Sequence, residues 1–197
     1  MLEITNNTVV KCHYSLREGG ASGELIESTE GAAPLTYVQG VGNMIPPFEQ
    51  NMLGKKAGDD FSFFIKSEDA YGNYDDTKVQ DIPYAAFKLE EGTNVHAIFE
   101  PGTFIPLQDE NGEEQFVTVI DTMPEAVRLD FNHPMAGVDL FFSVRVAEVR
   151  PATPEEVAHG HVHGDDGIIH YVIVYALTEC TLKTIIYSFE SKPLGLN

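Results

Sequence analysis

The sequence predicts an α+β fold in which an antiparallel sheet wraps around one short helix. Three segments alternate apolar and polar residues with a period of two, which is typical of strands that bury one face: residues 8–16, 60–66 and 140–149. Residues 45–54 carry the clearest signals of a helix. A strand-rich chain with one short helix buries its apolar surface by packing that helix against the sheet.

The helix signals lie close together in the sequence. Pro46 and Pro47 suit the first turn of a helix, and Gly54 suits its C-terminal cap. Phe48 and Met52 are four residues apart, so they share one face of the helix. We expect this face to pack against the alternating strands.

A second strand-rich block occupies residues 79–130. Asn111-Gly112 separates the apolar runs 104–107 and 115–120, and this dipeptide is a strong signal for a hairpin turn. The residues alone leave open whether this block extends the first sheet or forms a small second domain. A chain of 197 residues is long enough for one domain and a small companion.

The composition is that of a soluble globular protein, with 43% hydrophobic residues and a formal net charge of −19. The 12 Lys and Arg residues are scattered, whereas phosphate binding needs clustered cations, so we expect neither nucleic acid nor membrane as a partner. No uncharged apolar stretch of about 18 residues and no signal-peptide pattern is seen. Cys12 and Cys180 form no CxxC pair, which favours a reducing compartment, and we expect the cytoplasm.

Several motifs resemble, in the same order, those of FKBP-type peptidyl-prolyl isomerases. They are His13-Tyr14, residues 23–28 (GELIES), residues 42–49 (GNMIPPFE), Ala70-Tyr71-Gly72 and residues 79–83 (VQDIP). Three further motifs are similar to the SlyD subgroup of this family: residues 130–137 (DFNHPMAG), residues 152–156 (ATPEE) and His159-Gly160-His161. Such an ordered series is far more specific than any one motif.

The resemblance implies an FKBP-like antiparallel sheet wrapped on a short helix, with a small β-rich flap domain inserted into it. The isomerase domain would then consist of residues 1–78 and 131–157. Residues 79–130 would form the inserted chaperone domain, and residues 158–197 a C-terminal tail with a histidine cluster.

The reaction of this family explains why such residues are needed. Rotation about a peptide bond has a barrier of about 18–20 kcal/mol because twisting removes the C–N resonance. No bond is broken, so catalysis requires no nucleophile, metal or cofactor. A planar amide is more dipolar than a twisted one, so an apolar pocket that excludes water favours the twisted state.

Carried over position by position, the resemblance assigns the catalytic roles to Tyr14, Glu27, Tyr71 and Phe142. It assigns the apolar walls of the substrate site to Ile26, Leu35, Met44, Ile45, Phe48 and Ile82. In the inserted block we expect exposed apolar residues to bind unfolded chains, namely Phe99, Phe104, Ile105 and Phe116. The family pattern has Asp at the position of Glu27, which leaves open whether the longer carboxylate reaches its partner, either the Tyr14 hydroxyl or the twisting amide.

His159, His161 and His163 alternate with Gly160 and Val162. In an extended segment these imidazoles face the same side and can converge on Ni²⁺, Cu²⁺ or Zn²⁺, while a solvated histidine-rich tail is the simpler interpretation. The resemblance favours a Ni or Zn site. Residues 168–189 depart from the family, and the runs 172–177 and 182–189 indicate a hairpin or an apolar tail that docks on the insert.

Three functions are therefore considered. The favoured one is a monomeric isomerase and chaperone that acts on unfolded or nascent polypeptides containing proline. The second is a holdase chaperone with weak isomerase activity, and the third is a metal-handling protein that carries nickel.

Overall fold

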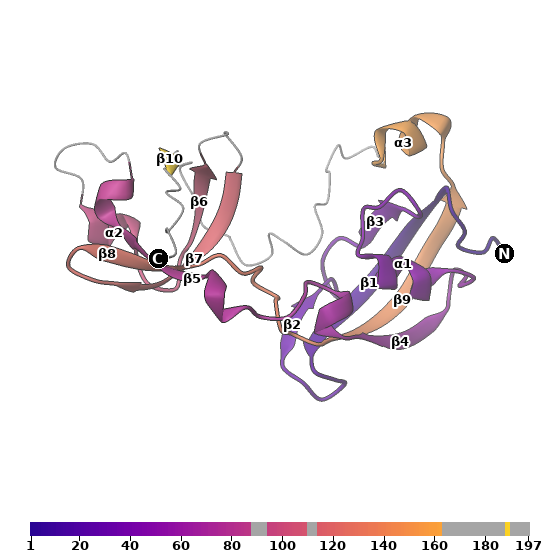
Figure 1. The fold of residues 1–197 in the computed structure, drawn as a ribbon. Coiled ribbons are helices and arrows are strands. Elements are labelled where there is room, and N and C mark those ends of the chain that lie inside the picture. The colour runs from indigo at the N-terminus through magenta and orange to yellow at the C-terminus, as the bar shows by residue number, and fades with distance from the viewer. Residues whose placement is uncertain (88–93, 110–113, 163–187, 190–197) are drawn as a thin grey trace. The chain divides into compact units, whose positions relative to one another are not determined.

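The computed structural model describes residues 1–87, 94–109, 114–162 and 188–189, and it divides into two compact units (Figure 1). The first unit consists of Met1–Asn73 and, in its described part, residues 137–162. The second consists of Tyr74–Ala136 together with residues 188–189. The second unit therefore interrupts the first in sequence, and its borders lie outside the residues 79–130 that the motifs suggested.

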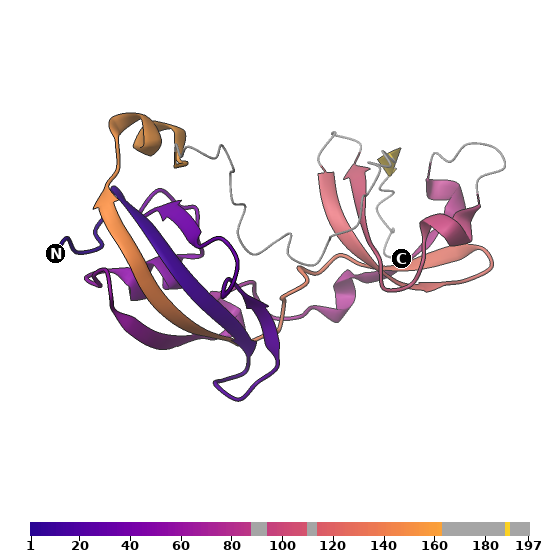
Figure 2. The same cartoon turned by 180° about the vertical axis from the view of Figure 1, so that it is seen from behind.

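The first unit is built on a sheet of five strands: β1 (Thr8–Glu18), β2 (Leu25–Ser28), β3 (Leu35–Val38), β4 (Asp60–Ile65) and β9 (Leu140–Pro151). The strand order is β2-β1-β9-β4, and β3 also pairs with β1. All of these pairs are antiparallel. Strand β9 follows the second unit in sequence, yet it lies between β1 and β4, so this sheet is completed only when the chain returns (Figure 2).

One helix, α1 (Pro46–Met52), packs against this sheet and confirms the helix predicted from the prolines and Gly54. Its side chains Phe48 and Met52 are both 0% exposed. The Phe48 ring lies 5.2 Å from that of Phe142 on β9 and 5.5 Å from that of Phe63 on β4, measured between centroids. The four-residue spacing thus places one helix face on the centre of the sheet.

Two shorter helical elements complete the described part of the first unit. The 3₁₀ turn η1 (Ser67–Asp69) follows β4, and α3 (Pro154–His159) follows β9. Thr153 caps α3 and forms a capping box with Glu156, in which each side chain bonds to the backbone of the other. This cap explains why the helix begins directly after the long strand β9.

The second unit has its own sheet, of strands β5 (Val79–Pro83), β6 (Phe104–Asp109), β7 (Glu114–Thr122), β8 (Ala126–Asp130) and β10 (Ser188–Phe189). The order is β10-β6-β7-β8-β5, and β10 alone pairs in parallel, with β6. Three short helical elements accompany it: η2 (Asp76–Lys78), η3 (Tyr84–Ala86) and α2 (Val95–Ile98). The second strand-rich block is therefore a separate sheet.

Strands β6 and β7 pair as the two arms of the predicted hairpin, with Phe104 opposite Thr118. The predicted turn at Asn111-Gly112 lies outside the described residues, as do the tail run at 172–177 and most of the run at 182–189. The last two described residues of the tail, Ser188 and Phe189, form β10.

The core of the second unit corrects part of the expected substrate surface. Ile82, Phe99 and Ile105 are 5%, 0% and 3% exposed and pack together in this core. The expectation that Phe99 and Ile105 are exposed is therefore wrong, and Ile82 is not available as a wall for a substrate. Since successive residues of a strand face opposite sides, Phe104 and Phe116 alternate with the buried Ile105 and Val117 and are themselves only partly buried.

Hydrogen bonds at Asp130 and Asn132 explain the borders of the second unit. The Tyr74 hydroxyl donates to Asp130 Oδ2 over 2.8 Å, and the backbone N–H of Asp75 donates to Asn132 Oδ1 over 3.0 Å. Asp130 and Asn132 are 8% and 4% exposed. These bonds join the segment that enters the second unit to the segment that leaves it.

Within the described ranges, no helix has both the length and the apolar character needed to cross a membrane.

Candidate active site

The centre of the first unit is a cluster of aromatic side chains from four elements. The Phe142 ring lies 5.2 Å from Phe48, 5.3 Å from Phe63 and 6.0 Å from Tyr14, measured between centroids. Strand register produces these contacts, because Phe142 lies opposite Phe63 on β4 and opposite Leu16 on β1, two residues from Tyr14. Phe48 and Phe142 are 0% exposed and Tyr14 is 2% exposed, so these rings are closed to solvent. We call them the apolar base of the site.

Glu27 lies on β2 next to this base. It pairs with Leu16 on β1, and its carboxylate lies near the Tyr14 hydroxyl. Burial, followed by the negative charge of Glu27, raises the pKa of Tyr14 well above its usual range.

Tyr71 is the second tyrosine near Glu27. Burial, and then the negative charge of Glu27, raises the pKa of Tyr71 to about 12. Both hydroxyls therefore remain protonated at neutral pH and can donate hydrogen bonds. Unlike Tyr14, Tyr71 is only half-buried, so part of its side chain faces solvent.

The backbone turn that carries Tyr71 is held firmly. The N–H of Gly72 donates to the Ser67 carbonyl over 2.7 Å, and Gly72 has a φ of 81°, a conformation that favours glycine. The chain that returns from the second unit braces this turn, since the N–H of Gly137 donates to the Gly72 carbonyl over 2.8 Å. The Asp139 carboxylate also accepts from the N–H of Ser67 over 2.8 Å.

The remaining residues assigned to the substrate site differ in accessibility. Leu35 and Met44 are buried, with 2% and 7% exposure. Ile26 and Ile45 are half-buried, like Glu27 and Tyr71. In the first unit the assigned residues that offer surface to a ligand are therefore Ile26, Glu27, Ile45 and Tyr71, whereas the aromatic rings of Tyr14, Phe48 and Phe142 are buried.

Two aromatic residues of this cluster were not assigned to the site from the sequence. Phe63 stacks on Phe142, and Tyr37 lies with its ring centroid 6.0 Å from that of Phe48. Phe63 belongs to an alternating strand, so its burial was predictable, but no motif connected it with the site. The Tyr37 hydroxyl donates to Gln39 Oε1 over 2.9 Å, a contact with no sequence signal.

Two of the three assigned metal ligands lie in the described part of the chain. The rings of His159 and His161 stack with centroids 5.6 Å apart, and Nδ1 of His161 lies 3.1 Å from the His159 carbonyl oxygen. His163 lies outside the described residues. Among the residues that the structure does describe, no three His, Cys, Asp or Glu side chains gather as a metal site.

Comparison with known proteins shows the family to which the chain belongs. Residues 2–99 match the family model of FKBP-type peptidyl-prolyl cis-trans isomerase. The chain is 37% identical to the FKBP-type peptidyl-prolyl cis-trans isomerase SlyD of Aeromonas hydrophila, over 86% of this chain and 75% of the relative. It is 35% identical to the SlyD of Yersinia pestis over 83% and 80%, and 34% identical to that of Escherichia coli K12 over 83% and 79%.

The chain therefore belongs to the FKBP-type peptidyl-prolyl cis-trans isomerase family, enzymes that accelerate rotation about the bond before proline. Within this family it is a SlyD-type member.

Proposed function

We propose that this enzyme combines two activities on one chain. The first unit accelerates rotation of X–Pro bonds at the surface formed by Ile26, Glu27, Ile45 and Tyr71. The second unit binds unfolded chains and keeps them close to that surface. The observation that carries the first part is the base of buried aromatic rings at Tyr14, Phe48 and Phe142, with Glu27 and Tyr71 close to Tyr14.

The first unit can favour the twisted amide by what it excludes and by what it donates. An apolar base gives little solvation to a planar, strongly dipolar amide, and a twisted amide loses less on leaving water. The Tyr71 hydroxyl, whose oxygen stays protonated, donates a hydrogen bond to the substrate carbonyl. Glu27, close to the Tyr14 hydroxyl, fixes the edge of the apolar base.

The second unit supports the chaperone role because it has a core of its own and leaves apolar side chains accessible. Ile120 on β7 is 44% exposed, and Phe104 and Phe116 are only partly buried. These three replace Phe99 and Ile105 as the proposed contacts for unfolded chains. A weakly bound client near the active site has a high effective concentration there.

Removal of the second unit tests this division of labour. Residues 74–136 are replaced by a short glycine linker, which can close the gap because Gly137 is hydrogen-bonded to Gly72. We expect activity on a short X–Pro peptide to persist, whereas catalysis of proline-limited protein refolding falls roughly a hundredfold. Equal losses on both substrates would make the second unit part of the active site. Undiminished refolding activity would show that it does not bind clients.

The alternative is a holdase in which isomerisation is weak. The same protease-coupled peptide assay separates the two, because a holdase suppresses aggregation of an unfolded protein while the peptide turns over slowly. The charge of −19 supports unfolded protein rather than nucleic acid or membrane as the partner. We propose that the protein is a monomer and that it acts in the cytoplasm. The free, buried thiol of Cys12 supports a reducing compartment.

We also propose that His159, His161 and His163 bind Ni²⁺ or Zn²⁺. The support is the stacked arrangement of His159 and His161, whose imidazoles are suitable ligands for both ions. Equilibrium dialysis with Ni²⁺ tests this site. Replacing all three histidines with Ala is expected to abolish most binding and to leave peptide isomerisation unchanged, because rotation needs no metal. An unaltered affinity for Ni²⁺ in the triple variant would disprove this site. It would also disprove nickel handling through these histidines as a main role.

A further inference from the structure

Strand β1 has a gap on one of its edges. Strand β9 pairs with β1 along its whole length, so β2 and β3 share the opposite edge. On that edge β3 pairs with Val9 to Cys12, and β2 pairs with Ser15 to Arg17. Among the described strands, none pairs with His13 and Tyr14 there, and Tyr14 carries the hydroxyl that lies near Glu27.

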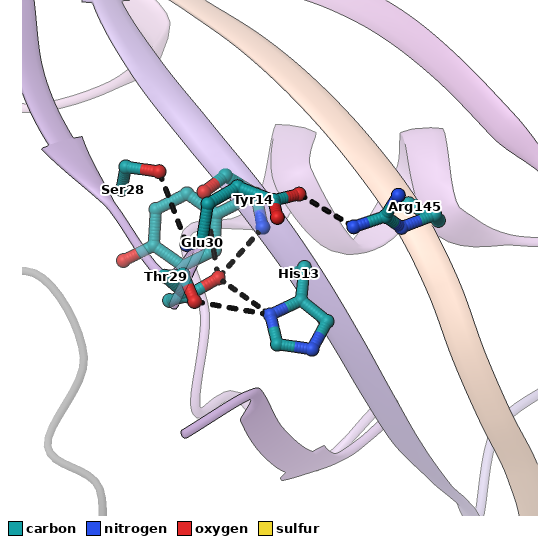
Figure 3. A network of polar contacts seen from close by, with 6 residues as sticks. All are labelled: His13, Tyr14, Ser28, Thr29, Glu30 and Arg145. Atoms are coloured by element: carbon teal, nitrogen blue, oxygen red, sulfur yellow. Dashed lines mark hydrogen bonds and ion pairs between the residues drawn. The ribbon is translucent and has the colours of Figure 1, made fainter. Parts of the chain in front are cut away.

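Thr29 fills this gap (Figure 3). The N–H of Tyr14 donates to the Thr29 hydroxyl oxygen over 2.9 Å, and the N–H of Thr29 donates to the Tyr14 carbonyl over 3.0 Å. His13 Nδ1 lies 3.1 Å from the Thr29 carbonyl oxygen and 3.4 Å from the Thr29 hydroxyl oxygen. A threonine side chain thus takes the place of a backbone carbonyl of a neighbouring strand.

The attachment of β2 to β1 is otherwise short. Three residue pairs join the strands, and their register is irregular between Leu16 and Arg17. Beyond Thr29, Glu30 contacts Arg145 over 2.6 Å, but their side chains are 60% and 53% exposed (Figure 3). Exposed ion pairs of this kind contribute little to stability. The partly buried Thr29 is therefore the main link at the end of β2 that lies next to Glu27.

We propose that Thr29 is a positioning residue for isomerisation. Its hydroxyl holds the backbone of Tyr14 beside the end of β2 and thereby keeps the Tyr14 side chain near the Glu27 carboxylate. The inference rests on the proposed function, in which this pair fixes the edge of the apolar base. Thr29 itself touches neither the substrate nor the reacting bond.

Replacement of Thr29 by Val removes the hydroxyl and keeps the β-branched shape, whereas Ser keeps the hydroxyl. We expect Thr29→Val to lower kcat/KM on a short X–Pro peptide about fivefold, because one hydrogen bond is lost. We expect Thr29→Ser to keep a kcat/KM near that of the wild type. Thr36→Val is the matched control, because Thr36 lies on β3 beside β1 and its hydroxyl bonds only to the Pro34 carbonyl over 3.4 Å. If the valine variant does not fold, Thr29→Ala gives the same comparison.

A second measurement separates positioning from general stability. In protein carrying ¹³C-labelled tyrosine, we expect Thr29→Val to shift the Tyr14 ring signal and to lower the pH at which that tyrosine ionises. Thr36→Val should leave the signal in place. A Thr29→Val variant with wild-type kcat/KM and an unmoved Tyr14 signal would overturn the inference, as would equal losses for Thr29→Ser and Thr29→Val.

The variants Tyr14→Phe and Glu27→Gln distinguish this failure from that of the proposed function. If both retain full kcat/KM, the pair has no part in catalysis, and the positioning role of Thr29 falls with it. If either is impaired while Thr29→Val is not, the proposed function stands and only the inference about Thr29 is wrong.

Discussion

Arg150 binds Glu156 through two nitrogens of its guanidinium group, with Nη1 2.9 Å from Oε2 and Nη2 2.6 Å from Oε1. The Glu156 side chain is 1% exposed and that of Arg150 is 33% exposed. Glu156 also accepts from the N–H of Thr153 over 2.8 Å, so one carboxylate joins the end of β9 to the cap of α3. Next to this helix, the Asn43 amide donates to the Gly160 carbonyl over 2.6 Å and ties α3 to the loop before α1.

Glu156→Gln is expected to lower the free energy of unfolding by about 1–3 kcal/mol. The substitution leaves a charged guanidinium with a neutral partner, but water reaches the exposed part of Arg150 and limits the loss. Urea unfolding measures the change. The control is Glu148→Gln, which removes the exposed Lys11–Glu148 pair, 51% exposed at the glutamate, and should cost less than about 1 kcal/mol. Equal losses of stability in the two variants would show that the Arg150–Glu156 pair contributes no more than the exposed Lys11–Glu148 pair.

Tyr71→Ala is expected to lower kcat/KM on a short X–Pro peptide about tenfold or more, or about 1.4 kcal/mol of transition-state stabilisation. Tyr71→Phe keeps the ring and loses only the hydroxyl, so its smaller loss measures the hydrogen bond to the substrate carbonyl. Far-UV circular dichroism checks that both variants fold. Full activity of the alanine variant would remove Tyr71 from the active site.

Glu27→Gln is expected to reduce kcat/KM less than Tyr71→Ala does, by about threefold. The substitution keeps the size of the side chain and removes only the negative charge near the Tyr14 hydroxyl. The protease-coupled peptide assay measures the difference. A loss as large as that of Tyr71→Ala would give the charge of Glu27 a direct part in catalysis.

Phe142→Ala is expected to lower the free energy of unfolding by about 3–5 kcal/mol, since it opens a cavity at the centre of the aromatic base. Phe142 is 0% exposed and touches the rings of Tyr14, Phe48 and Phe63. Phe64→Ala, on the same sheet but 45% exposed, is the control and should cost far less. Urea unfolding compares the two, and similar costs would be inconsistent with a packed base.

Tyrosines whose pKa is raised in the folded state, among them Tyr14, Tyr37 and Tyr71, predict how stability depends on pH. Unfolded tyrosine ionises near pH 10, whereas the pKa of Tyr71 is about 12 in the folded state and that of Tyr14 is also raised. Above about pH 10 the unfolded chain therefore loses protons that the folded chain keeps, and the free energy of unfolding falls from there to about pH 12. Urea unfolding between pH 8 and about 11 follows this loss. Tyr71→Phe should make the free energy of unfolding fall less steeply with pH. An unchanged pH dependence would contradict the raised pKa of Tyr71.

The sequence by itself determined the elements and the family. Pro46 and Gly54 bounded α1, the alternation around Tyr14 and Phe142 predicted β1 and β9, and a series of ordered motifs indicated the isomerase. These signals are local or depend on residue order, so they survive without knowledge of which segments meet. Even the hairpin of β6 and β7 followed from a short-range turn signal.

Only the tertiary structure decided which side chains meet and which are covered. Alternation shows that Ile105 and Phe104 face opposite sides of a strand, but it does not show which side is covered, so the burial of Phe99 and Ile105 was missed. The place of Thr29 in the gap along β1 depends on the register of β2, which pairs Ser28 with Ser15 and Glu27 with Leu16. Register of this kind is set by packing across the whole sheet, which is complete only when β9 returns after the second unit.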